Sequence, residues 1–117
     1  MTTTSQKYQT IDRASLKAKI DKKEIFQLWN VLNKDNYKPE SNIAGSKWVP
    51  VDGITEKLAS EKIPSKTETV ITYCAGPQCQ SSRQAAEKLA SMGYTNVFAY
   101  EGGVKDWSES GMPVVTL

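Results

Sequence analysis

Only two cysteines occur in the 117-residue chain, and both lie in the stretch YCAGPQCQSSR at residues 73–83. The chain has no histidine, which excludes the usual Cys/His zinc sites and a Cys–His catalytic pair. A site of four thiolates would need more cysteines than the chain has. Three interpretations of Cys74 and Cys79 therefore stay open: a pKa-tuned nucleophile, a redox pair, or inert packing.

The elements around Cys74 favour the nucleophile. TETVITYC (67–74) is the clearest strand pattern in the chain, and SSRQAAEKLASMG (81–93) is the clearest helix pattern. A cysteine between them lies near free N–H groups of the loop and of the first helical turn. Those donors should lower the pKa of the Cys74 thiol below its free value of about 8.5. The same donors would form a pocket for an anion such as a sulfane sulfur, sulfite, phosphate or arsenate.

Each cysteine also has a plainer interpretation. Cys74 could be a small buried hydrophobic residue that ends a strand, and Cys79 a loop residue without a fixed role. A thioredoxin-like redox motif has two residues between its cysteines, whereas four separate Cys74 from Cys79. This spacing disfavours a redox pair, although a flexible loop could still bring the two residues close enough for a transient disulfide.

The rest of the chain alternates strand and helix patterns, which indicates an α/β fold with a mainly parallel sheet. Asp12 is the expected N-cap of the first helix. Ser81, with Gln84 three residues later, is the expected N-cap of the helix after the cysteines, and Gly93 is expected to end that helix. The remaining elements are strands at 24–32 and 96–100, a loop at 33–47, an extended piece at WVPVDGI and a short helix at ITEKLASEK. Ligands bind such sheets beyond the carboxyl ends of the strands, where Cys74 lies.

Composition and charge set the broad class. The length predicts one domain over residues 1–117, and 38% hydrophobic with 24% charged residues is typical of a globular protein. A net charge of +2 from scattered lysines gives no nucleic-acid footprint. The polar start MTTTSQKYQT predicts a flexible segment over 1–7 and has no apolar signal region. With no apolar run of membrane-spanning length, we expect no membrane partner and a cytoplasmic location.

The sequence resembles a single-domain rhodanese over most of its length. TVITYC is similar to the strand that delivers the rhodanese active-site cysteine. The following SSRQAAEKLASMGYTNVFAYEGGVKDWSESGMPVV is similar to the family's helix, Gly-Tyr, strand, Gly-Gly, Trp and Gly-x-Pro segment. Upstream, LWNV and SNIAGSKWVPVD match the family pattern in degraded form.

The resemblance implies a rhodanese-like fold, with helices on both faces of the sheet, and a sulfurtransferase. Cys74 would take a sulfur atom from a small donor as a persulfide and pass it to cyanide, a small thiol or a protein thiol. The loop that follows would form the pocket, without a metal or cofactor. The candidate binding residues are Ala75, Gly76, Pro77, Gln78, Cys79, Gln80 and Ser81 in the loop, and Arg83 in the helix.

Three family positions are substituted. Asn30, Leu32 and Asn42 stand where the family usually has Asp, Arg and His. Charged links at these positions would be lost, which is neutral for stability if both partners changed together. A non-catalytic rhodanese-like module that binds a partner or senses redox state is the alternative function that these losses support.

The loop after Cys74 is about two residues longer than in the usual rhodanese pattern. Related phosphatases and arsenate reductases also have an enlarged loop, but their phosphate-binding arginine corresponds here to Gln80, so these activities are disfavoured. Residues 75–82 are uncharged, and Arg83 is the nearest cation in sequence. Because thiosulfate is a dianion, we expect a persulfide or polysulfide to be at least as plausible a donor.

Three tryptophans and a glycine pair have structural interpretations. Trp29, Trp48 and Trp107 are expected in the core. Gly102-Gly103 is expected to form a turn with positive φ, and it could also help to close the pocket.

Overall fold

The computed structural model describes residues 8–116 and shows one central parallel sheet. The segment 1–7, for which flexibility is expected, lies outside the described residues. The strand order is β1-β6-β5-β2-β4, and every neighbouring pair is parallel. The strands are β1 (Gln9–Thr10), β2 (Gln27–Asn30), β4 (Lys47–Trp48), β5 (Val70–Tyr73) and β6 (Val97–Tyr100). The predicted α/β fold is confirmed.

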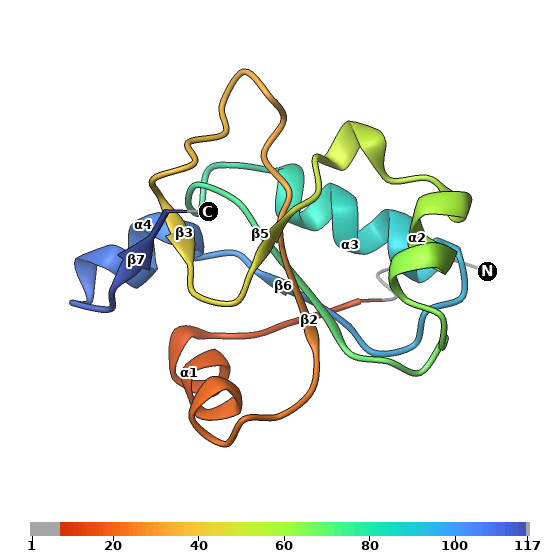
Figure 1. Cartoon of the computed structure of the whole chain (residues 1–117), viewed down its shortest axis with the longest axis horizontal. Coiled ribbons are helices and arrows are strands. Elements are labelled where there is room, and N and C mark those ends of the chain that lie inside the picture. Colours follow the sequence, from red (N-terminus) through yellow and green to blue (C-terminus); the bar gives the residue numbers. More distant parts are fainter. Residues whose placement is uncertain (1–7, 117) are drawn as a thin grey trace.

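Helices cover both faces of this sheet, as Figure 1 shows for α2 and α3 on one side and α1 and α4 on the other. Their bounds are α1 (Arg13–Asp21), α2 (Glu56–Lys62), α3 (Ser81–Ser91) and α4 (Gly103–Glu109), with a 3-10 turn η1 at Val51–Gly53. A small antiparallel ladder of β3 (Asn42–Ile43) and β7 (Val114–Val115) lies beside α4. The predicted loop at 33–47 therefore contains a short strand, because β7 supplies a partner that comes from the far end of the chain.

Alternation along β5 decides which way Cys74 faces. Val70 packs in the core cluster on the α2 and α3 face, whereas Ile71 and Tyr73 pack in the cluster on the opposite face. Cys74, one residue beyond the strand, again belongs to the α3 cluster. The period of two in a strand thus turns the thiol toward the start of α3.

Helix ends follow the local sequence in two cases and depart from it in one. The Oδ1 of Asp12 accepts a hydrogen bond from the Ser15 N–H at 2.8 Å, so this predicted N-cap is confirmed. Gly93, with φ of 99°, lies just beyond α3 as expected. The predicted Ser81 cap is wrong, since Gln80 holds the cap position, with no side-chain cap bond, and Ser81 is the first helical residue. The Gln84 N–H donates to the Gln80 carbonyl at 2.9 Å, so the first helical hydrogen bond starts one residue earlier than predicted.

Two of the three tryptophans lie in the core as predicted, and the third does not. Trp29 and Trp107 are buried, but Trp48 is 38% exposed. The Trp48 ring stacks on Tyr37 with their centroids 4.1 Å apart, and its Nε1–H donates to the Leu32 carbonyl at 2.7 Å. Because β4 is the last strand of the sheet, this ring covers a loop rather than entering the core.

A buried pair of amides joins β2 to β3. The Asn30 Nδ2 donates to the Asn42 Oδ1 at 2.9 Å, and both side chains are fully buried. The Asn30 Oδ1 accepts from the Leu32 N–H, and the Asn42 Nδ2 donates to the Pro39 carbonyl. Two neutral side chains thus pair at the positions where the family usually has Asp and His, so neither buried amide lacks a partner.

Candidate functional site

The loop between β5 and α3 folds back over the end of its own strand. Cys74 is fully buried, and Cys79 is half-buried and packs against the same core cluster. The N–H of Cys79 donates to the Gly76 carbonyl at 3.0 Å, which closes a tight turn around Pro77. This turn returns residue 79 toward the strand end, so the structure brings together the two thiols that the sequence left apart.

The first turn of α4 holds this loop by its backbone. The N–H of Val104 donates to the Cys74 carbonyl at 3.0 Å, and the N–H of Lys105 donates to the Ala75 carbonyl at 2.8 Å. In a trans peptide the C=O and N–H groups point in opposite directions. The N–H groups of Ala75 and Gly76 therefore face away from α4 and toward the inside of the loop.

Gly103 makes this close approach possible. It has φ of 65°, and a Cβ built on it would lie 2.5 Å from the Cys74 carbonyl oxygen and 2.8 Å from the Gly76 nitrogen. The expected positive φ is thus found at Gly103. It is wrong for Gly102, whose φ of −61° is helical because this residue caps α4.

Backbone N–H groups of the loop and of α3 converge on the two sulfurs. The Ser82 N–H hydrogen-bonds to the Cys74 sulfur, and those of Ser81 and Ala75 to the Cys79 sulfur. The buried Ser82 hydroxyl has no hydrogen-bond partner within residues 8–116, but it lies near Cys74 and acts to lower the pKa of that thiol. These N–H groups lie where the sequence predicts an anion pocket, and two of them bind the Cys79 sulfur.

The expected low pKa of Cys74 is wrong for this arrangement. Burial, and then the hydrogen bond with Cys79, raises the pKa of the Cys74 thiol to about 11 against the opposing effect of Ser82. Burial also acts to raise the pKa of Cys79, but hydrogen bonds from the Cys74 thiol and from Ser81 and Ala75 outweigh it and leave that pKa below its ordinary value. Of the two thiols, Cys79 therefore ionises more readily than Cys74.

A pocket of about 550 Å³ opens above the loop. Its lining consists of Ala75, Gly76, Pro77, Gln78, Cys79 and Lys105. Five of the predicted binding residues line it, whereas Gln80 and Ser81 lie at the start of α3. Arg83 faces Glu101, with 3.8 Å between its Nη1 and the Glu101 Oε2, and is not part of the lining.

Lys105 and Ser82 were missed by sequence reasoning. Lys105 lies 31 positions beyond Cys74, and its side chain reaches the pocket only because Gly103 lets α4 approach the loop. The Gly102-Gly103 pair just before Lys105 was the sequence feature that could have indicated this close approach. Ser82 follows the predicted cap, and no sequence pattern showed that its hydroxyl would be buried beside Cys74.

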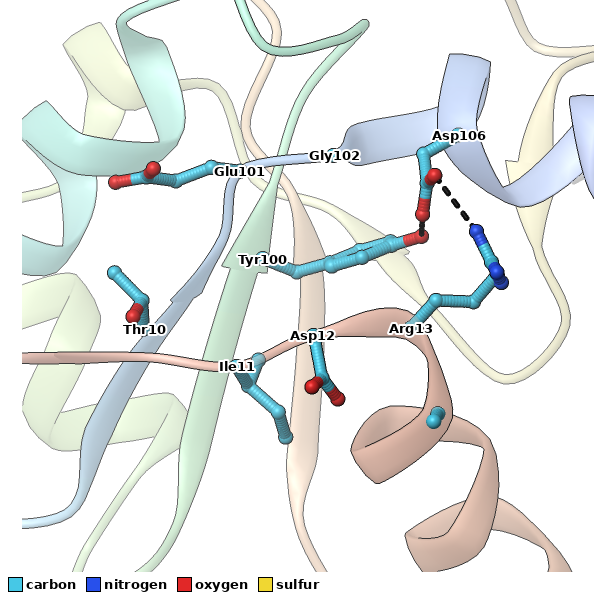
Figure 2. Close-up of a pocket in the computed structure, with 9 residues that line it drawn as sticks. Thr10, Ile11, Asp12, Arg13, Tyr100, Glu101, Gly102 and Asp106 are labelled. Carbon is cyan, nitrogen blue, oxygen red and sulfur yellow. Dashed lines mark hydrogen bonds and ion pairs between the residues drawn. The ribbon is translucent and has the colours of Figure 1, made fainter.

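A second cleft, of about 440 Å³, lies where α1, β6 and α4 meet and has neither cysteine in its lining. Figure 2 shows Arg13 and Tyr100 both directed at Asp106 of α4, while Glu101 points away from it. The Tyr100 hydroxyl donates to the Asp106 Oδ2 at 2.6 Å, and the Arg13 Nη1 lies 2.8 Å from the Oδ1. Burial, and then the Asp106 carboxylate, raises the pKa of Tyr100. These contacts fix α4, and through it the loop.

Comparison with known proteins agrees with this geometry. Residues 12–110 match the model of the family described as rhodanese-like domain. The chain belongs to the rhodanese-like family. No curated protein matches the chain closely enough to count as a relative.

Solved structures of rhodanese-like proteins share the fold. A protein from Bacillus halodurans is 31% identical with a TM-score of 0.80, covering 92% of this chain and 77% of that one. A rhodanese-related protein from Thermoplasma volcanium is 28% identical with a TM-score of 0.67, covering 92% and 98%. A structure described as a rhodanese with anions, from E. coli, is 29% identical with a TM-score of 0.63, covering 80% and 100%. The predicted resemblance is thereby confirmed.

No group of acidic, histidine and cysteine side chains that could hold a metal occurs in the part of the chain that the structure describes. No helix within residues 8–116 is both long and apolar enough to cross a bilayer.

The tight fit of α4 on the loop predicts the effect of a single methyl group. Gly103→Ala should lower the free energy of unfolding by more than about 1 kcal/mol, because the methyl group meets the Cys74 carbonyl and the backbone has positive φ. Urea denaturation measures the change. Gly53→Ala is the matched control, since a Cβ there meets no atom within 4 Å, and should change stability by less than about 1 kcal/mol. Equal effects of the two changes would contradict the fit.

The sharing of a proton by the two thiols predicts the order of alkylation. In a series of pH values, iodoacetamide should label Cys79 first, with a midpoint below that of an ordinary free thiol. Cys74→Ala should move the Cys79 midpoint upward, because the thiol hydrogen bond is lost while burial remains. Peptide mapping of the alkylated protein measures both midpoints. Labelling of Cys74 before Cys79 would show that the proton lies on the other sulfur.

Proposed function

We propose that this rhodanese-like protein is a sulfurtransferase that carries sulfane sulfur as a persulfide on Cys74 and passes it to a thiol, cyanide or a protein thiol. The observation that carries the proposal is the convergence of the Ala75, Ser81 and Ser82 N–H groups on the sulfurs beyond β5. Preorganised N–H donors stabilise negative charge at the place where a reaction generates it. In sulfur transfer that charge lies on the outer sulfur and on the departing thiolate.

The first step needs a Cys74 thiolate, and Cys79 is placed to generate it. The Cys79 thiolate, hydrogen-bonded to the Cys74 thiol, accepts its proton. The Cys74 sulfur then attacks the sulfane sulfur of the donor, whose S–S bond breaks and whose electron pair leaves with sulfite or a shortened polysulfide. The N–H and hydroxyl of Ser82 lie beside Cys74, where they stabilise the attacking thiolate and the same thiolate when it later leaves.

The second step transfers the outer sulfur. An acceptor thiolate or cyanide enters the pocket and attacks the outer sulfur of the persulfide, and the electron pair of the broken S–S bond returns to Cys74. The pocket, open above the loop and about 550 Å³ in volume, admits a small acceptor. Proton balance is restored when Cys74 takes its proton back from Cys79.

The charges around the pocket favour a polysulfide or persulfide donor. Lys105 is the one cation in its lining, and its Nζ already lies 2.9 Å from the Glu109 carboxylate in an exposed pair. Arg83, the cation expected from the sequence, pairs with Glu101 instead. A single partly neutralised lysine matches the charge of a monoanionic persulfide better than that of the thiosulfate dianion.

A non-catalytic rhodanese-like module that binds a partner or senses redox state is the second candidate. The raised pKa of Cys74 is the observation that favours it, because a protonated buried thiol does not attack a donor. Arsenate reductase and phosphatase activities have less support. The loop offers Gln80 where those enzymes place an arginine, and Arg83 points to Glu101.

Sulfur loading tests the proposal directly. Cys79→Ser protein is incubated with polysulfide and, separately, with thiosulfate, and its intact mass should increase by one sulfur atom. The increase should be slower than in the native protein, because the Cys79 base is absent, but the Cys74 persulfide should persist. The increment should be absent from Cys74→Ser protein and should be removed by cyanide with formation of thiocyanate. No increment with either donor, or an increment of the native protein located only on Cys79, would favour the non-catalytic module.

A further inference from the structure

We propose that Cys79 resolves the Cys74 persulfide when no acceptor arrives: it attacks the inner sulfur, forms a Cys74–Cys79 disulfide and expels hydrosulfide. This step rests on the proposed function, because it starts from the persulfide. The domain would then carry sulfur on Cys74 and would also have two redox states, with Cys74 and Cys79 either as thiols or as a disulfide.

The loop geometry places the attacking sulfur. The Cys79 N–H bond to the Gly76 carbonyl, 3.0 Å long, closes the loop, and both cysteines pack in the core cluster on the α3 face. Both are free thiols in this structure, and they lie close enough for each to shift the pKa of the other. Two thiols in such contact need little movement to form an S–S bond, provided that their Cα atoms lie within about 7 Å.

The surroundings of Cys79 identify it as the thiol that meets small molecules. Cys79 lines the pocket, whereas Cys74 is fully buried and absent from the lining. The N–H groups of Ser81 and Ala75 bind the Cys79 sulfur, so a thiolate there is stabilised while it waits beside Cys74. The Ser82 hydroxyl, which has no hydrogen-bond partner within residues 8–116, lies near the Cys74 sulfur.

The step balances in atoms and electrons. The Cys79 thiol first gives its proton to the outer sulfur of the persulfide. The Cys79 thiolate then forms a bond to the Cys74 Sγ, the bond between that Sγ and the outer sulfur breaks, and the electron pair leaves with the protonated outer sulfur as hydrosulfide. Two equivalents of a small thiol, or one dithiol, then reduce the disulfide and return both cysteines. In thiol–disulfide exchange the weaker base leaves faster, and hydrosulfide is a weaker base than the buried Cys74 thiolate. Attack by Cys79 on the inner sulfur is therefore preferred over attack on the outer one.

Competition between the two routes sets the lifetime of the persulfide. An external acceptor must enter the pocket from solution, whereas Cys79 is already in contact, and such intramolecular reactions have high effective molarities. Without an acceptor, the native protein should thus proceed from persulfide to disulfide, and the pocket would then be closed to a second donor molecule.

The experiment compares native, Cys79→Ser and Cys74→Ser proteins under anaerobic conditions. Each is exposed briefly to polysulfide, desalted, and analysed by intact mass and by peptide mapping after alkylation. The native protein should become two hydrogen atoms lighter, with a Cys74–Cys79 disulfide that a dithiol reverses. Cys79→Ser protein should keep one added sulfur at Cys74, and Cys74→Ser protein should show no such disulfide.

Two controls identify the source of the disulfide. Oxidised glutathione at the same concentration, which carries no sulfane sulfur, should give much less disulfide in the same time. In a longer incubation with thiosulfate, which contains no hydrosulfide, the hydrosulfide trapped from native protein should equal the disulfide formed, one for one.

The outcomes separate the two proposals. Native protein that keeps its added sulfur with a free Cys79 thiol overturns the resolving step and leaves the sulfurtransferase standing. Equal disulfide formation with oxidised glutathione also overturns it, because the persulfide is then unnecessary. If neither native nor Cys79→Ser protein takes up sulfur, and the native protein forms no thiocyanate when cyanide is present, the proposed function is overturned, and the resolving step with it.

Discussion

Two backbone hydrogen bonds from α4 to the loop after Cys74 are the constraint on which the site depends. Because Val104 and Lys105 bind the carbonyl groups of Cys74 and Ala75, the N–H groups of the same peptides face into the loop. The contact requires a glycine at position 103, and it brings Lys105 to the pocket. Asp106, held by Tyr100 and Arg13, keeps α4 in place. The site is thus organised from a helix almost thirty residues away in sequence.

Burial and amide donors act in opposite directions on the two sulfurs. Cys74 lies at the buried end of β5, where desolvation disfavours its thiolate, and Cys79 lies where N–H groups compensate for burial. Cys74 therefore keeps its proton to higher pH, and Cys79 ionises more readily. The buried Cys74 can thus carry the sulfur while the accessible Cys79 acts as its base. A raised pKa of Cys74 therefore need not prevent its attack on a donor, because Cys79 can accept the proton.

Local patterns in the sequence predicted much of the fold and the position of the nucleophile candidate. The strand before Cys74, the Asp12 cap and the end of α3 at Gly93 depend on neighbouring residues, so they were readable in advance. The pKa of Cys74 was not, because it depends on packing by side chains from other elements. The roles of Lys105 and Ser82 and the exposure of Trp48 likewise follow from tertiary contacts. The Ser81 cap was wrong by one position, because α3 already begins at residue 81.

The central claim is that loop amides hold a sulfane sulfur on Cys74. The amide proton and nitrogen shifts of Cys79→Ala protein, measured before and after loading with polysulfide, test it most directly, since this change frees the amides from the Cys79 sulfur. The account predicts downfield shifts of the Ala75, Ser81 and Ser82 amide protons that exceed those elsewhere and reverse on addition of cyanide. A protein that carries the added sulfur with these three amides unchanged would contradict it.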